Sequence, residues 1–137
     1  MKNSIKILIL ILISLNLNAQ IIECRSKEDN RIGIQLAKNK FESLRSSNGT
    51  VYKKAAYNNK YDYTVFVAIT ELGNESLLLY NKSENFEGIE FFAGHMDVEF
   101  TNGIKKEFSL YCYDLNQMNK KRKKEGVKLS PITVKDY

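Results

Sequence analysis

The 137-residue sequence contains no tryptophan, one proline and one histidine, and its seven glycines stand singly along the chain. It therefore lacks the glycine-rich loop that cradles phosphate and the G-x-S-x-G turn of a serine nucleophile. Its two cysteines do not form the C-x-x-C pair of a thiol-exchange enzyme. No repeat of fixed period occurs, which excludes a solenoid. With no catalytic motif present, we expect a protein that is not an enzyme and has no cofactor.

The first residues have the composition that is typical of a secretory signal peptide. Two lysines precede an unbroken aliphatic run, residues 7–13, and Ala19 is small enough for cleavage. The run is too short to span a bilayer about 30 Å thick, which takes roughly 20 apolar residues. We predict that residues 1–19 are removed between Ala19 and Gln20, leaving a secreted or periplasmic chain without a transmembrane segment. An uncleaved N-terminal anchor is the alternative.

The predicted mature chain, residues 20–137, has the length of a single small domain. An even number of cysteines in an exported protein favours a disulfide, here between Cys24 and Cys112. Such a bridge closes a loop of nearly the whole domain, worth roughly 4–5 kcal/mol in the chain-entropy model. Two buried free thiols are the alternative. Much of the net charge of +5 comes from one run, 120–124, within a basic C-terminal segment, 120–137.

Hydrophobic periodicity predicts one helix followed by strands. Ser26 is suited to cap a helix, and Gly49 is suited to end it. Between them, apolar residues recur at spacings of 3, 4 and 3, as on one helix face: Ile34, Ala37, Phe41 and Leu44. After Gly49 the period changes to two, and residues 61–70 have the strongest strand pattern.

The segment 97–113 carries the clearest local signal, because Asn102-Gly103 lies between two alternating runs. A two-residue loop would mix apolar and charged partners on both faces, so we predict a three-residue loop, 101–103. This register pairs Phe100 with Ile104, Met96 with Phe108 and Glu99 with Lys105, and it places Ile104, Phe108, Leu110 and Cys112 on one inward face. After this hairpin, Leu115–Glu125 fits a short polar helix that ends at Gly126.

These patterns predict an α+β fold, with an N-terminal helix packed on a mainly antiparallel meander sheet of about five strands. The order of elements is similar in layout to cystatin-like folds over Ser26–Tyr113. The Q-x-V-x-G signal of cystatins is absent, so the resemblance concerns layout and does not imply protease inhibition.

His95 is the only histidine, and strand parity puts it on one face with Asp97 and Glu99. Such a group suggests a general base or a metal ligand. A zinc site needs three or four ligands, however, and one histidine with carboxylates at strand spacing does not supply them. The simpler interpretation is a solvated sheet face, and we expect neither a catalytic residue nor a bound metal.

Two groups of residues are candidates for binding a partner. The run 120–124 is suited to an anionic surface, although it also fits a solvated helix face. Tyr111 and Tyr113 point opposite to Cys112, either outward or against a second layer, and tyrosine is favoured at binding surfaces. No nucleic-acid motif accompanies them. The candidate binding residues are Tyr111, Tyr113, Lys120, Lys121, Arg122, Lys123 and Lys124.

Three functions are consistent with these observations. The leading hypothesis is an exported, non-catalytic binding domain that engages a protein partner through a sheet face or edge, in an inhibitor or immunity role. The second is a protein that binds a polyanion or the envelope surface through residues 120–124. The third is a small hydrolase centred on His95.

Overall fold

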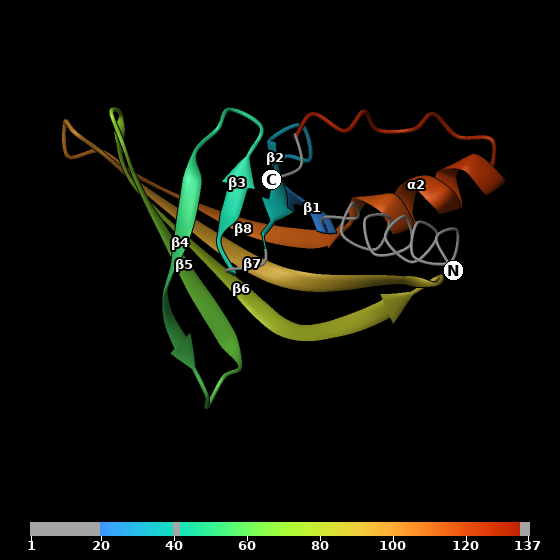
Figure 1. Cartoon of the computed structure of the whole chain (residues 1–137), viewed down its shortest axis with the longest axis horizontal. Coiled ribbons are helices and arrows are strands. Elements are labelled where there is room, and N and C mark those ends of the chain that lie inside the picture. Colours follow the sequence, from blue (N-terminus) through green and yellow to red (C-terminus); the bar gives the residue numbers. More distant parts are fainter. Residues whose placement is uncertain (1–19, 40–41, 135–137) are drawn as a thin grey trace, which may run out of the picture.

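The chain forms a closed barrel of eight antiparallel strands in sequence order, in which the first strand pairs with the last (Figure 1). The computed structural model describes residues 20–39 and 42–134, so the predicted signal peptide lies outside the described residues. The strands are β1 (Gln20–Ser26), β2 (Gly33–Lys38), β3 (Leu44–Ser46), β4 (Val51–Asn58), β5 (Tyr63–Thr70), β6 (Gly73–Phe86), β7 (Ile89–Phe100) and β8 (Lys105–Asp114), followed by the helix α2 (Leu115–Lys124). Across the described ranges, no helix is both long and apolar enough to span a membrane.

The prediction of an N-terminal helix on a five-stranded sheet is wrong, and so is the cystatin-like layout. The segment assigned to the helix contains β2 and β3 instead. Leu36 and Leu44 belong to the barrel core, whereas Ala37 is buried although it points the opposite way from Leu36. A strand that is buried on both faces loses its period of two, and here its apolar spacing imitates a helix. The hydroxyl of Ser26 accepts hydrogen bonds from the backbone of Glu28 and Asp29 in a turn, not at a helix start.

The outer side of β2 is contacted by residues 131–133 through Gln35. The Gln35 side chain donates to the Pro131 carbonyl at 2.9 Å and accepts from the backbone N–H of Thr133 at 2.8 Å. The two contacts have sequence separations of 96 and 98 residues. Residues 131–133 therefore lie against the outer side of β2, which no local pattern could reveal.

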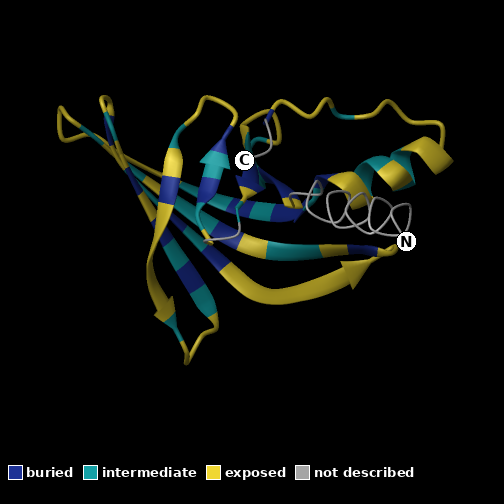
Figure 2. Ribbon diagram, in the orientation of Figure 1, coloured by how far each residue is buried: buried dark blue, intermediate teal, exposed yellow. Residues whose placement is uncertain are grey.

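Two apolar clusters hold the fold together (Figure 2). The larger cluster fills the barrel, as expected for eight strands: Ile22, Cys24, Leu36, Leu44, Tyr52, Phe66, Ala68, Leu77, Leu79, Leu110 and Cys112. The smaller cluster lies on the opposite side of the strands and involves the first turn of α2: Ile21, Ile89, Tyr113 and Leu115. The helix begins at Asp114, whose carboxylate accepts from the Gln117 backbone N–H at 2.9 Å and so caps the first turn.

The predicted disulfide between Cys24 and Cys112 is present. Both residues are fully buried in the barrel core. Gly94 leaves room beside them, because a Cβ at this position would lie 3.5 Å from Cys112 Sγ and 3.1 Å from the Leu79 side chain.

The β7–β8 hairpin has the predicted register. Met96 pairs with Phe108 and Glu99 with Lys105, and the backbone N–H of Phe100 donates to the Ile104 carbonyl at 2.8 Å. Leu110 and Cys112 are buried as expected, whereas Ile104 at the tip is exposed. The helix predicted at Leu115–Glu125 is also confirmed, since α2 covers all but the last of these residues.

Candidate functional site

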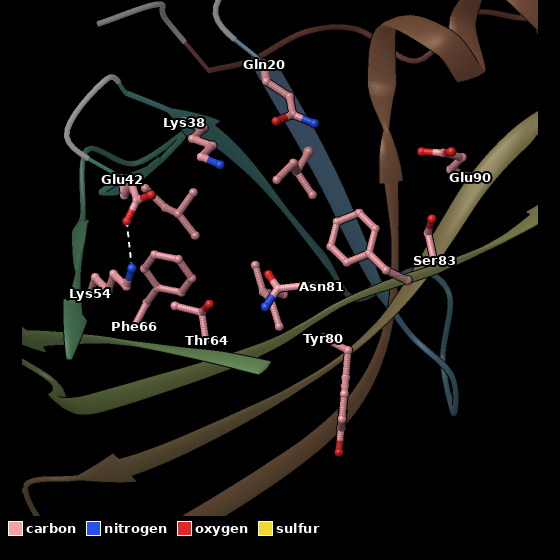
Figure 3. Close-up of a pocket in the computed structure, with 14 residues that line it drawn as sticks. Gln20, Lys38, Glu42, Lys54, Thr64, Phe66, Tyr80, Asn81, Ser83 and Glu90 are labelled. Carbon is pink, nitrogen blue, oxygen red and sulfur yellow. Dashed lines mark hydrogen bonds and ion pairs between the residues drawn. The ribbon is translucent and has the colours of Figure 1, made fainter. Parts of the chain in front are cut away.

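One end of the barrel opens into a cavity of about 310 Å³, which we call the barrel mouth (Figure 3). It lies near the lower end of the range of small-molecule pockets, roughly 300–1,000 Å³. On several strands the inward-facing row changes from an apolar to a polar residue at its last step. These strand ends are β1, with Gln20 beside Ile22; β2, with Lys38 beside Leu36; β5, with Thr64 beside Phe66; and β7, with Glu90 beside Phe92. Asn81 also lines the mouth, from within β6 where its pairing with β7 shifts register.

The floor of the mouth is the top of the barrel core. Ile22, Leu44, Phe66 and Leu79 are buried there, and Phe92 packs against them. Because side chains fill the barrel below, the mouth is a bowl and not a channel. The polar side chains stand around this bowl (Figure 3), so a molecule inside it would meet apolar contacts below and hydrogen-bonding groups at the rim.

Three charged residues form one side of the rim. Lys54 Nζ lies 2.7 Å from Glu42 Oε2, and Lys38 lines the same side (Figure 3). The hydrogen bond and charge of Lys54, with a smaller contribution from Lys38, lower the pKa of the Glu42 carboxyl. All three side chains are exposed, and an exposed ion pair contributes only about 0–1 kcal/mol. The pair can therefore open at little cost.

The Glu42–Lys54 ion pair crosses the least paired part of the barrel wall. Among the described residues, β3 and β4 are joined through two pairs, Leu44 with Tyr52 and Arg45 with Val51. Lys54 follows this short pairing on β4, and Glu42 precedes it. The ion pair thus links the two chain segments where the backbone ladder ends, at the edge of the mouth.

Three of the predicted binding residues come together, although not at the mouth. Tyr111, Tyr113 and Arg122 line a second cavity of about 490 Å³, together with Arg25 and Met118. The predicted lysines do not join them there. Lys121 is held by Glu87 and lies 3.9 Å from Glu125, whereas Lys120, Lys123 and Lys124 are exposed.

Tyr113 has a structural environment that the sequence did not indicate. Its hydroxyl donates to Glu23, which is 3% exposed, and Arg25 Nη2 donates to the same carboxylate at 3.1 Å. Gln35 supplies a further hydrogen bond at 3.3 Å. Burial, and then the hydrogen bond to Glu23, raise the pKa of Tyr113. Tyr113 therefore supplies a hydrogen bond to a buried carboxylate. Of the two predicted orientations, outward or against a second layer, Tyr113 has the second, because it packs with Leu115 of α2.

His95 lies on β7, and its Nε2 is 2.9 Å from Asp97 Oδ1. Glu99 lies on the same face and pairs with Lys105, as predicted, but it is outside the cluster of ligand atoms. Glu107 of β8 takes its place, because it lies directly opposite Asp97. One ligand atom from each of His95, Asp97 and Glu107 lies within 4.8 Å of the others. None of the three lines the barrel mouth.

No known family matches this sequence, and no curated protein or solved structure was found to be significantly similar to it. The class that the fold and cavity define is a small, filled antiparallel barrel with a polar-rimmed mouth.

Proposed function

We propose that the protein is an exported, non-catalytic binding protein whose ligand is a small amphipathic molecule held in the barrel mouth. The observation that carries this proposal is the change from apolar to polar residues at the last inward step of the strands around a cavity. Pockets with an apolar lining and a few convergent polar groups are the usual form of a small-molecule site. Export is supported by the signal-like first residues and by the disulfide, which suits an oxidising compartment.

A protein partner, our leading expectation from the sequence, has less support. Closure pairs the first strand with the last, so a partner strand could add mainly along the parts of β4 and β6 that extend beyond their pairing with β3 and β5. Binding through an outer face remains a hypothesis. The mouth, in contrast, offers a concave surface with both apolar and polar groups.

The polyanion hypothesis is also weakened by the positions of the basic residues. Lys121 and Arg122 make contacts within the chain, to Glu87 and Ser130. The run ends α2, where positive charge stabilises the helix dipole, so it has a structural role without a partner. Heparin binding that weakens steeply with salt, and that is lost when Lys120, Lys123 and Lys124 are replaced by glutamine, would restore this hypothesis.

The proposal is tested with the uncharged fluorescent probe N-phenyl-1-naphthylamine. We expect saturable binding with increased fluorescence in the wild type, and a loss of binding in Ser83→Trp, which places an indole in the mouth. Lys82→Trp is the matched control, because Lys82 is the neighbouring residue on β6 and does not line the mouth. Absence of binding to the wild type, or equal binding by a folded Ser83→Trp variant, would overturn the proposal.

A further inference from the structure

The outer face of the β7–β8 hairpin carries a compact group of metal-ligating side chains. Met96 packs against the barrel core, so its neighbours His95 and Asp97 point outward. Glu107 is the cross-strand partner of Asp97 and shares this outward face. The hairpin register therefore brings one imidazole and two carboxylates to the same place.

The distances suit a single ion. His95 Nε2 and Asp97 Oδ1 are 2.9 Å apart, and the three ligand atoms lie within 4.8 Å of one another. Ligands that each lie about 2.0–2.2 Å from a zinc ion are separated by no more than twice that distance. Small rotations of these three side chains would bring their ligand atoms within this separation. The His95 and Asp97 side chains are 37% and 54% exposed, so they have room to rotate and an ion can reach them.

The charges on this face also require explanation. The next outward pair along the ladder, Glu99 and Lys105, has opposite charges, whereas Asp97 and Glu107 have like charges directly across the strands. Like charges directly opposite each other destabilise a sheet. A cation between the two carboxylates would replace this repulsion with attraction.

We propose that His95, Asp97 and Glu107 bind one divalent transition-metal ion of the Zn²⁺ type on the outer face of the barrel. An imidazole ligand selects such ions over Mg²⁺ and Ca²⁺, which prefer oxygen ligands alone. Three protein ligands leave an open position for water or for a group from another molecule. This site is separate from the barrel mouth and does not depend on the proposed small-molecule ligand.

The test is calorimetric titration of the untagged, disulfide-bonded protein with ZnCl₂, with MgCl₂ as the comparison ion. Both cysteines are in the disulfide, so no thiol competes for zinc. We expect one Zn²⁺ per chain and no comparable Mg²⁺ binding. His95→Ala and Glu107→Gln should each weaken zinc binding at least about tenfold, since even groups that only support a ligand are worth 10–100-fold.

Glu99→Gln is the matched control, because Glu99 lies on the same face but pairs with Lys105 outside the group. Its affinity for zinc should equal that of the wild type. The single histidine gives a second readout, since zinc should shift its imidazole NMR signals. The proposal is overturned by the absence of saturable zinc binding, by binding that survives in both His95→Ala and Glu107→Gln, or by an equal loss in Glu99→Gln.

Discussion

Cys24 of β1 lies directly opposite Cys112 of β8, and the disulfide between them joins the two strands that close the barrel. The bond links residues 88 positions apart in the sequence. It therefore connects the two ends of a meander that would otherwise be held at this seam by backbone hydrogen bonds, core packing and the Tyr113–Glu23 hydrogen bond.

Removing the disulfide is expected to lower the free energy of unfolding substantially. The chain-entropy model gives a stabilisation of roughly 4–5 kcal/mol for a closed loop of this length. Urea unfolding of the Cys24→Ala/Cys112→Ala double variant should show this loss, and reductant should have a similar effect on the wild type. Reductant should leave the double variant unchanged. If the double variant unfolds at the wild-type midpoint, then the seam does not depend on the bond.

Tyr113→Phe should destabilise the protein, because the buried Glu23 carboxylate loses a hydrogen-bond donor. A buried polar group without its partner costs about 1–3 kcal/mol. The control is Tyr111→Phe, since the Tyr111 hydroxyl is outside this network and the residue is only half-buried. Its effect should stay within about 0.5 kcal/mol. Equal urea midpoints for the two variants would contradict a stabilising role for the Tyr113–Glu23 contact.

Stability should also fall at alkaline pH. Burial is the main cause that raises the pKa of both Tyr52 and Tyr113, and their hydrogen bonds to Glu75 and Glu23 raise it further. The folded chain then keeps these protons when the unfolded chain has lost them. The free energy of unfolding therefore decreases as the pH rises above about 10, the ordinary tyrosine value. Urea unfolding at successive pH values measures this, and Tyr52→Phe should show a shallower decline than the wild type.

The parts of the fold that could be predicted depend on short-range constraints. Asn102-Gly103 defines the position of a turn, and the side-chain period of two then determines the partner of each residue in β7 and β8. The disulfide followed from there being only two cysteines in a chain with a signal-like start. The same register places Asp97 opposite Glu107. The grouping of His95, Asp97 and Glu107 could therefore have been derived from the sequence and the predicted hairpin.

The parts that could not be predicted depend on contacts between distant segments. β2 resembles a helix in sequence because its outer side is also covered, by residues 131–133 through Gln35. The barrel mouth was missed for a related reason. Gln20, Lys38, Thr64 and Glu90 each resemble an ordinary polar strand end, and only barrel closure brings them around one cavity.

Glu42→Gln should change which ligands the barrel mouth prefers. The Glu42 carboxylate is paired with Lys54 and lies within the field of Lys38, so removing its charge leaves two ammonium groups on that side of the rim. Because the ion pair is exposed, the free energy of unfolding should change by less than about 1 kcal/mol. The anionic probe 8-anilino-1-naphthalenesulfonate should bind more tightly, by up to about fivefold, which corresponds to the same energy. The uncharged N-phenyl-1-naphthylamine should bind with the same affinity as it does to the wild type. An equal gain in affinity for both probes would show that the change reflects a wider opening of the mouth and not the charge of its rim.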